Sequence, residues 1–329
     1  MSDWEQLAPL ELEVDALELE RRELAVSSEF TRVTTTVVLH GRGETGRGED
    51  VIYEAALHDE YPRPDLTGRR TLAEYSELLE PLELHDYRRW AFESAALDLA
   101  LRQGGITFGE AVGREYRPVR FVVSTRGDLR RFLEAVPSLE FKIDPESEWT
   151  REKIDALGST GKIRVADLKG YYRGTVVDQP ADARLYRDVV DGFGDAVIED
   201  AAFTDETRPI LLEAADRLSF DAPIHSVEDV EALEVEPRWL NVKPSRFGPL
   251  RRLFEALEYA EQRRIRLYGG GQFELGVGRS HIQALASLYY ADNANDVAPG
   301  VYNEPQLPAD PPASPLPVRG PRGLAFDPS

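Results

Sequence analysis

The sequence predicts an α/β protein, a modified (β/α)8 TIM-type barrel with an α+β capping domain at its amino end. Short apolar runs that each end in a charged residue recur along the chain, and roughly 20 to 30 residues of helical pattern separate them, as in (β/α) barrels. Strand-like sequence followed by helix precedes this series, which predicts a separate α+β unit. The charged-ended runs are 139–144, 163–169, 196–200, 218–221 and 240–244.

Residues 1–116 are predicted to form the capping domain. Residues 9–57 alternate between apolar and polar side chains as antiparallel strands do, and 31–39 is rich in β-branched residues. The glycine-rich segment 40–49 is followed by neither a helix pattern nor a Lys-Ser/Thr pair, so we expect a hairpin turn there and not a phosphate cradle. From 71 to 101 the apolar spacing is helical.

Residues 117–294 are predicted to form the barrel. Strands are expected at 119–123 and 265–268 in addition to the five runs, so seven strands alternate with seven helices. The eighth strand is expected near the start of this segment or near 296–298. The helices are expected near 128–136, 147–157, 181–191, 205–216, 226–233, 247–262 and 278–290.

Residues 295–329 are rich in proline, which predicts extended, non-helical chain. We expect this segment to be a strap that lies back on the capping domain, in preference to a disordered tail. The reason is that it keeps apolar side chains that can pack, namely Leu316, Val318, Leu324 and Phe326.

The charge balance restricts the partners. The 329 residues include 60 acidic and 39 basic ones, for a formal charge of −21, and such an excess would repel nucleic acid and anionic membranes. Scarce lysine, abundant acid and no cysteine favour a halophilic protein, whose acidic surface is screened by a salt-rich cytosol. The alternative is an ordinary acidic protein from a GC-rich genome, which would also use arginine in preference to lysine. Lysine occurs only at positions 142, 153, 162, 169 and 243.

The absence of cysteine excludes disulfides, Cys-ligated zinc and thiol nucleophiles. The first five residues are acidic and lack the apolar core of a signal peptide. No stretch approaches the roughly 18 apolar residues of a membrane span. We therefore expect a soluble cytoplasmic protein.

Three carboxylates at the ends of consecutive strands form the first candidate site. Asp167, Glu199 and Asp221 would converge at one rim of the barrel, where their mutual repulsion would be severe. A hard divalent cation such as Mg²⁺ relieves this repulsion because it prefers oxygen ligands. The alternative is that each carboxylate forms an ion pair with a nearby cation, for which Lys142, Lys169 and Arg164 are available.

Two lysines flank the carboxylate strands. Lys142 and Lys243 would face each other across the metal, where partial burial and a nearby cation lower the pKa of an amine into a useful range. A metal ion that holds a substrate carboxylate, with an amine on each side of the metal, can support removal of the proton next to that carboxylate. Otherwise, both lysines would be ordinary strand-end partners in salt bridges.

Five segments, in order and correctly spaced, resemble motifs of the enolase superfamily, closest to its muconate-lactonizing and mandelate-racemase-like branch. The first is similar to the glycine-rich turn of the family's capping domain and the second to its Ala-x-x-Asp-x-Ala-Leu helix. The others resemble the sixth-strand lysine motif, the seventh-strand segment and the closing Asn-Asp. In this sequence they are 40–49, 95–101, 242–250, 270–278 and 295–297.

The resemblance implies Mg²⁺ ligands at Asp167, Glu199 and Asp221, and an acid/base pair at Lys142 and Lys243. It also implies that the loop at 26–30 closes over the substrate, with the turn near Tyr53 beneath it.

The chain departs from the family's pattern on several strands. The usual Lys-x-Lys of the second strand is Glu140-Phe141-Lys142, and a shift of two residues would put Asp144 at the base position with Lys142 as an auxiliary group. The usual Asp-x-Asn ends in Lys169, and the Asp-Glu pair of strand five is Asp221-Ala222. We take Lys169, Glu274 and Glu140 as substrate-binding or auxiliary groups.

Two of the five histidines lie in the predicted barrel segment. A catalytic histidine of the racemase type would stand at the end of strand seven, where 270–272 reads Gly-Gly-Gln. His225 and His281 are therefore expected to be helix-start or packing residues.

The predicted function is Mg²⁺-dependent abstraction of the proton alpha to a carboxylate through an enolate. Racemisation or epimerisation, cycloisomerisation, and elimination of the o-succinylbenzoate synthase kind all remain open. The expected partner is a small-molecule carboxylate, with neither nucleic acid nor membrane, and assembly into a homo-oligomer is left open. The alternative is a non-catalytic barrel that binds a metal or a metabolite.

Overall fold

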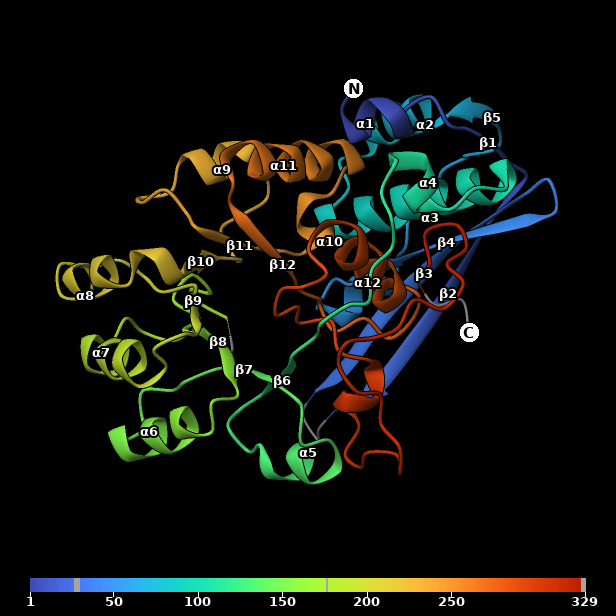
Figure 1. Ribbon diagram of the computed structural model, residues 1–329. Helices are drawn as coiled ribbons and strands as arrows, with labels where there is room; N and C mark the ends of the chain where they lie inside the picture. Colours follow the sequence, from blue (N-terminus) through green and yellow to red (C-terminus); the bar gives the residue numbers. More distant parts are fainter. Residues whose placement is uncertain (27–29, 176, 327–329) are drawn as a thin grey trace.

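The computed structural model describes residues 1–26, 30–175 and 177–326. It contains an amino-terminal unit of strands and helices beside a ring of parallel strands surrounded by helices (Figure 1). The expected loop at 26–30 lies partly outside the described residues. No helix among the described residues combines the length and the apolar character needed to cross a bilayer.

The cap contains two antiparallel sheets. Three long strands form one of them in the order β2-β3-β4, and β1 pairs with β5 in the other. β3 and β4 are joined by Arg42 and Gly43, both with positive φ (51° and 76°), which is the geometry of a two-residue hairpin. The hairpin expected in the glycine-rich segment is thus confirmed. The strands are β1 Glu11–Val14, β2 Ala16–Ala25, β3 Thr31–Gly41, β4 Glu44–Asp50 and β5 Gly68–Thr71.

The glycines after this hairpin let helix α3 lie directly on β4. A Cβ atom at Gly46 would stand 2.3 Å from the carbonyl oxygen of Ala95, and one at Gly48 would stand 2.0 Å from that of Ala91. Only hydrogen fits in these gaps. The cap helices are α1 Asp3–Leu7, η1 Ala55–His58, α2 Leu72–Leu79, η2 Glu80–Leu82, α3 Asp86–Gly104 and α4 Phe108–Val112.

Capping boxes define where three of these helices begin, the first being α1, where the pair is Ser2 and Glu5. Thr71 and Glu74 exchange side-chain and backbone hydrogen bonds at the start of α2, and Thr107 with Glu110 does the same for α4. α3 ends at Gly105, whose φ of 66° suits glycine.

Seven parallel strands form the barrel sheet in the order β12-β11-β10-β9-β8-β7-β6. They are short because each needs only enough residues to cross the buried centre. Their bounds are β6 Val123–Thr125, β7 Phe141–Ile143, β8 Ile163–Asp167, β9 Val197–Glu199, β10 Leu218–Phe220, β11 Trp239–Val242 and β12 Arg266–Gly269.

Asn295 and Asp296 close the ring between the first and last strands. Asn295 forms a parallel bridge with Phe121, and Asp296 forms one with Gly270. The Val122 amide donates to the Asn295 carbonyl at 2.8 Å, and the Asp296 amide donates to the Gly269 carbonyl at 2.7 Å. The later of the two expected positions for the eighth strand is therefore confirmed, although the strand is reduced to two bridging residues.

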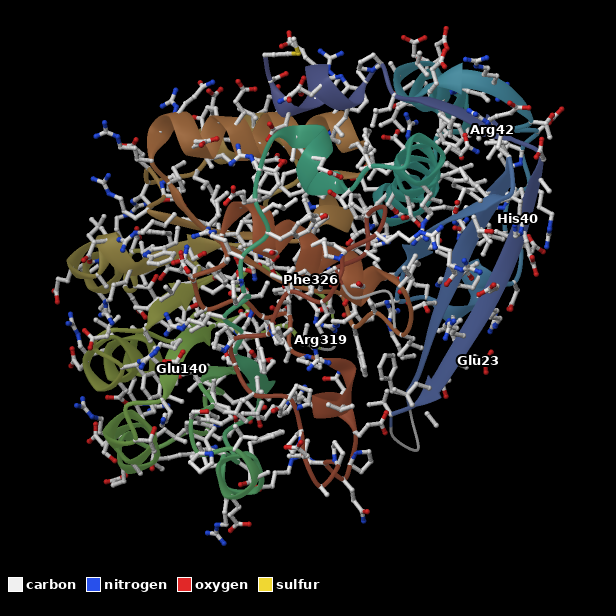
Figure 2. The ribbon with its side chains drawn as sticks, turned by 45° about the vertical axis from the view of Figure 1, so that its right-hand side comes forward. Glu23, His40, Arg42, Glu140, Arg319 and Phe326 are labelled. Carbon is white, nitrogen blue, oxygen red and sulfur yellow. The ribbon has the colours of Figure 1, made fainter. Side chains whose placement is uncertain are left out.

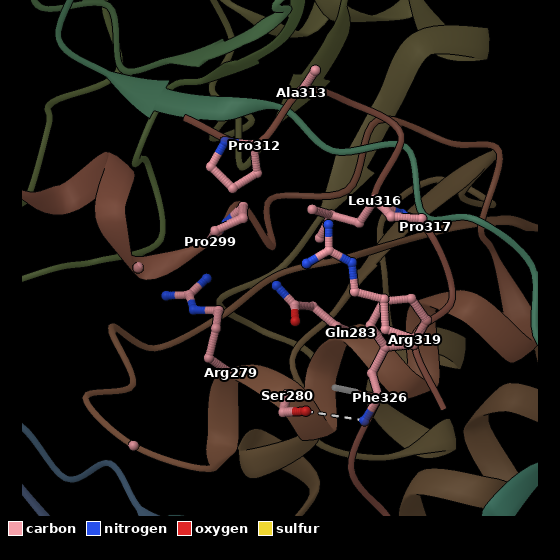
Figure 3. A pocket seen from close by; sticks show the side chains of 12 residues that line it. Arg279, Ser280, Gln283, Pro299, Pro312, Ala313, Leu316, Pro317, Arg319 and Phe326 are labelled. Carbon is pink, nitrogen blue, oxygen red and sulfur yellow. Dashed lines mark hydrogen bonds between the residues drawn. The ribbon is translucent and has the colours of Figure 1, made fainter. Parts of the chain in front are cut away.

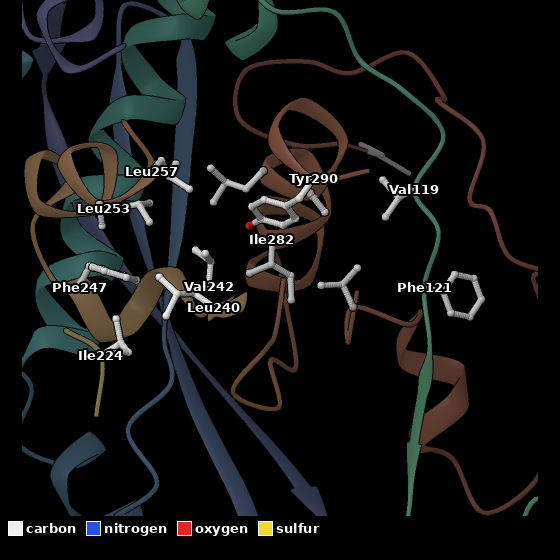
Figure 4. Close-up of a cluster of buried hydrophobic side chains, with 14 of the residues drawn as sticks. Val119, Phe121, Ile224, Leu240, Val242, Phe247, Leu253, Leu257, Ile282 and Tyr290 are labelled. Carbon is white, nitrogen blue, oxygen red and sulfur yellow. The ribbon is translucent and has the colours of Figure 1, made fainter. Parts of the chain in front are cut away.

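Helices alternate with these strands and cover the outside of the ring (Figure 1). Apolar side chains on α11 and α12 pack with those of β11 and of residues 119–121 in a core that extends into the cap (Figure 4). The helices are α5 Arg130–Ala135, α6 Arg151–Ser159, α7 Ala183–Gly192, α8 Arg208–Glu213, η3 Ala215–Arg217, α9 Val227–Glu231, α10 Pro244–Phe247, α11 Leu250–Arg263, α12 Gly278–Tyr289 and η4 Gly300–Asn303.

The carboxy-terminal segment contacts both parts of the molecule. Leu316 pairs with Val119 of the barrel, while the Leu324 amide donates to buried Asp98 on α3 at 2.9 Å. In Figure 2, Arg319 and Phe326 of this segment lie between Glu140 in the barrel and the cap sheet marked by His40.

Candidate active site

The site lies at the carboxyl ends of the barrel strands. Asp167 of β8 pairs in register with Glu199 of β9, so both side chains enter the ring at the same level. Two residues earlier on these strands, Val165 and Val197 pack with Tyr268 and form an apolar floor. The carboxylates are consequently held above a dry layer of the barrel.

Asp167, Glu199 and Asp200 form a buried cluster whose carboxylate oxygens lie within 4.8 Å of one another. The sequence predicted the first two as metal ligands but did not single out Asp200. The available signal was the second acidic residue at the end of a buried strand. The bend that brings both acids to one point, with φ of 51° at Asp200, is invisible in the sequence.

Asp200 binds the backbone that leads to Asp221. Its two oxygens accept hydrogen bonds from the amides of Asp221 and Ala222, at 2.8 and 3.0 Å. Burial, with the nearby charges of Asp221 and Asp167, raises the pKa of the Asp200 carboxyl to about 7. Asp200 thus orients the end of the neighbouring strand.

Asp221, the third ligand predicted from the sequence, lies outside this three-carboxylate cluster. Its Oδ2 is 2.7 Å from the Lys243 ammonium and accepts a hydrogen bond from the Tyr172 hydroxyl at 2.9 Å. Its Oδ1 is 3.1 Å from the Arg246 guanidinium. Burial opposes ionisation, but Arg246 and Lys243 hold the pKa of Asp221 well below its usual value.

Lys142 is buried between the cluster carboxylates. Its ammonium nitrogen lies 2.6 Å from Glu199 Oε1, 3.1 Å from Asp167 Oδ2 and 3.7 Å from Asp296 Oδ2. Burial alone would lower the pKa of Lys142, but attraction to Glu199 and Asp167 outweighs it and raises the pKa well above the usual value. Lys142 is thus an ammonium ion in this arrangement.

Glu199 is oriented by neutral donors as well as by Lys142. Asn241 donates to its Oε1 at 3.1 Å, and the Tyr268 hydroxyl donates to its Oε2 at 2.6 Å. Because the barrel supplies three donors, this carboxylate has a fixed direction.

Lys169 and Asp144 stand beside the cluster. Lys169 forms an ion pair with Asp167 and lies 3.7 Å from Asp144 Oδ1. Burial opposes ionisation of Asp167, but Lys169 and Lys142 hold its pKa well below its usual value.

The other two predicted auxiliary groups are engaged elsewhere. Glu140 pairs with Arg120 and Arg164, two residues before Lys142 and hence one layer nearer the amino end of the strand. Glu274 accepts a hydrogen bond from the Gln272 amide at 2.6 Å and pairs with Arg279 at 3.0 Å.

The cap reaches the edge of the site. Tyr87 of α3 accepts a hydrogen bond from Gln272 at 2.8 Å, and the half-exposed Tyr53 ring lies 4.3 Å from the guanidinium of buried Arg32. Glu49 on β4 accepts hydrogen bonds from the backbone amides that precede and begin α12, at residues 275, 276 and 278. The cap therefore fixes the segment that follows the seventh barrel strand.

The two histidines lie apart from the carboxylate cluster. His281 is fully buried within α12, and burial lowers its pKa to about 3. His225 lies beside the carbonyl of Arg246 at 3.0 Å and 3.6 Å from Asp86.

A cavity of about 340 Å³ lies away from the carboxylates, between α12, η4 and the carboxy-terminal segment. Figure 3 shows Arg279, Gln283 and Arg319 among its lining side chains. None of the cluster carboxylates lines it.

The charges around the cluster suit a divalent cation. By formal charge, six carboxylates lie against four cationic side chains, which is an excess of two negative charges among these described groups. Burial and the neighbouring carboxylates oppose this excess and raise the pKa of Glu199 to about 8 and that of Asp200 to about 7. All the cluster donors are oxygens, as Mg²⁺ and similar ions prefer. The carboxylates are Asp144, Asp167, Glu199, Asp200, Asp221 and Asp296, and the cations are Lys142, Lys169, Lys243 and Arg246.

Family models match both parts of the chain. The model described as "Domain of unknown function (DUF8230) C-terminal domain" matches residues 115–304, and the corresponding N-terminal model matches residues 5–111.

Similar proteins include an o-succinylbenzoate synthase of Listeria innocua, 28% identical over 182 residues, which are 54% of this chain and 41% of that protein. The chain thus aligns with less than half of that relative. A muconate lactonizing enzyme from Pseudomonas fluorescens, solved with muconolactone, has a TM-score of 0.72 at 20% identity, over 95% of this chain and 96% of that one. An enolase superfamily member from Listeria innocua gives 0.62 at 19% identity, over 88% and 84%.

Proposed function

Because the chain belongs to the DUF8230 family and has the fold of the enolase superfamily, we propose that it catalyses metal-dependent removal of the proton alpha to a substrate carboxylate. The observation that carries this proposal is the position of two lysines. Lys142 and Lys243 are both buried at the mouth of the barrel, and each is paired with a different strand-end carboxylate.

Asp167 and Glu199 would hold the cation, which we infer to be Mg²⁺, and Asp221 is kept as the third ligand that the sequence predicted. Asp200 is the other candidate, since it lies in the cluster with Asp167 and Glu199. Both of its oxygens, however, accept hydrogen bonds from the backbone, whereas the partners of Asp221 are side chains. When bound, the cation would supply positive charge to the carboxylate of the substrate.

The two lysines differ in their surroundings, which suggests different roles. Lys142 is held as an ammonium ion by Glu199 and Asp167, so it suits the donation of a proton or the stabilisation of negative charge on an enolate oxygen. Lys243 pairs with Asp221, which is shared with Arg246 and Tyr172. We therefore assign Lys243 as the base that takes the alpha proton.

The proposed substrate is a small carboxylate with an acidic alpha proton. Racemisation or epimerisation would use both lysines on opposite faces, whereas cycloisomerisation or elimination needs one lysine as acid or base and the other as a fixed positive charge. The named relatives support the last two reactions equally. We propose a soluble, cytoplasmic setting without nucleic acid or membrane partners.

Deuterium exchange tests the proposal directly. Candidate amino acids, dipeptides, sugar acids and cyclic carboxylates would be incubated with the protein and Mg²⁺ in D₂O, and alpha-deuterium would be read by NMR. Exchange that needs both Mg²⁺ and Lys243 is the expected result. Absence of exchange and of turnover across the whole panel would count against it.

A non-catalytic barrel that binds a metal or a metabolite is the second candidate. The observation in its favour is that Lys142, Lys169, Lys243 and Arg246 all form ion pairs with site carboxylates. This reading predicts that Lys243→Ala binds carboxylate ligands as the wild type does, and that neither protein exchanges protons.

A further inference from the structure

Lys169 engages both oxygens of Asp167, although it is only two residues further along the chain. Its backbone amide donates to Oδ1 at 3.1 Å, and its ammonium group pairs with Oδ2. Asp167 is fully buried. One oxygen of this proposed metal ligand is therefore already paired with a cation of the chain itself, and the other accepts a backbone hydrogen bond.

The backbone at Lys169 makes this contact feasible. Its φ of 53° is in the left-handed region, which residues other than glycine seldom adopt. The Gly170 amide then donates to the Asp200 carbonyl at 2.8 Å, so the turn is fixed against the neighbouring strand. Strained backbone of this kind is retained where the surrounding structure holds it in place.

A second carboxylate lies within reach of the same ammonium group. Asp144, which follows β7, has Oδ1 3.7 Å from Lys169 Nζ, and this buried oxygen accepts no hydrogen bond from any described residue. The Asp144 side chain as a whole is 27% exposed, so it lies at the edge of the buried cluster. A lysine has a flexible four-carbon stem and can change partner without moving its backbone.

Lys142 is less suited to such a movement. Its side chain is only 2% exposed, and it is enclosed by Glu199, Asp167 and Asp296. The Lys169 side chain is 14% exposed. Of these two ammonium groups, Lys169 is the more exposed, and its second partner, Asp144, is also more exposed (27%) than Asp296 (19%), the third partner of Lys142.

We propose that Lys169 is a built-in competitor for the divalent cation: its ammonium group neutralises Asp167 in the metal-free protein and transfers to Asp144 when the metal site is filled. This inference rests on the proposed function, because it takes the carboxylate cluster to be a divalent-cation site. Lys169 then lowers the affinity for metal, and Asp144 raises it by accepting Lys169.

Calorimetric titration of the metal-free protein with Mg²⁺ tests this without any activity assay. Lys169→Met should tighten Mg²⁺ binding about tenfold or more, because a competing charge at contact distance is removed. Asp144→Asn should weaken binding. In the double variant, the Asp144→Asn change should have little further effect, because no ammonium group needs a second partner. Lys162→Met, at the other end of the same strand, should leave the affinity within about twofold.

The outcomes separate this inference from the proposed function. If the wild type binds Mg²⁺ and Lys169→Met binds it with the same affinity, Lys169 is no competitor, while the metal site stands. Equal weakening by Asp144→Asn in both backgrounds would mean that Asp144 acts only as a general negative charge, which overturns the transfer. If no variant binds Mg²⁺, both proposals are wrong. Near-ultraviolet circular dichroism would verify the fold of each variant.

Discussion

Arg32 on β3 of the cap donates a hydrogen bond of 2.9 Å to the backbone carbonyl of Gln272, which follows the seventh strand of the barrel. The same guanidinium also donates to the carbonyls of Phe273, Ile52 and Val51, at 3.1, 2.7 and 2.7 Å. One buried side chain thus connects residues 51–52 of the cap with residues 272–273 of the barrel at the edge of the site.

Replacing Arg32 should destabilise the protein. Arg32→Met leaves four carbonyls without their donor, in three buried hydrogen bonds and one partly buried one. We expect the free energy of unfolding to fall by about 3 kcal/mol or more. Urea titration followed by tryptophan fluorescence would measure the change. The control is Arg63→Met, in an exposed segment, which should change the free energy by less than about 0.5 kcal/mol. Equal stability of the two variants would contradict this stabilising role of the Arg32 hydrogen bonds.

Gly48 should not tolerate alanine. The added Cβ would meet the Ala91 carbonyl oxygen at 2.0 Å, so α3 would have to move away from β4. We expect a loss of about 3 kcal/mol in the free energy of unfolding, or failure to fold. Gly194→Ala is the matched control, because nothing lies within 4 Å of its Cβ position. Thermal melts of both variants measure this, and a normal melting temperature for Gly48→Ala would show that the packing can relax.

Mg²⁺ should raise the melting temperature of the wild type. A ligand at 100 times its dissociation constant stabilises a folded protein by about 2.7 kcal/mol, and EDTA should remove the effect. Asp221→Asn should abolish most of the shift if Asp221 is the third ligand. A shift that survives in Asp221→Asn and disappears in Asp200→Asn would assign that role to Asp200 instead. Absence of any shift in the wild type would favour a barrel held by ion pairs alone.

Lys243 should be needed for proton exchange more than for folding. Lys243→Met removes the proposed base, and we expect exchange with any active substrate to fall about 10²- to 10⁴-fold. Mg²⁺-dependent stabilisation should remain, which distinguishes this effect from loss of the metal site. Lys153→Met, on the exposed side of α6, should keep the wild-type exchange rate. If the Lys243→Met variant is active, the base is Lys142 or Asp144 instead.

His225 should make stability depend on pH. The Asp86 carboxylate, 3.6 Å from the imidazole, raises the pKa of His225 in the folded protein. The stabilising contribution is therefore fully present below the unfolded pKa of about 6.5, and it is lost as the pH rises through the folded value. His225→Asn should accordingly reduce the urea midpoint more at pH 5.5 than at pH 8.5. Introducing Asp86→Asn first should remove this difference, and its persistence would assign the effect to another group.

The barrel was predictable from the sequence because five of its strands end in a charged residue and helical spacing follows each strand. The resemblance to the enolase superfamily also located the closing Asn-Asp, whose role rests on two backbone bridges at Asn295 and Asp296. A two-residue strand has no periodicity of its own. The count of strands therefore left two positions open, near the start of the barrel segment or near 296–298, and the bridges at Asn295 and Asp296 identify the later one.

The site was less predictable because side-chain partners depend on register and bends. Glu140 and Lys142 share a face as expected, yet the layers of the barrel separate them. Asp200 joins the cluster only through a left-handed turn that no pattern indicates. The sequence allowed two roles for Lys142, either facing a metal ion or forming an ion pair. Only the distances in the structure show that it forms ion pairs with Glu199 and Asp167.

The closure of the ring at Asn295 has a consequence for synthesis of the chain. Strands β6 to β12 are all made before these closing residues, so the nascent sheet keeps two unpaired edges until almost the whole barrel has emerged from the ribosome. Unpaired edges are templates for pairing with other chains. A truncation just before Asn295 would preserve that open state, and we expect it to yield a protein that aggregates and cannot fold to a stable smaller barrel.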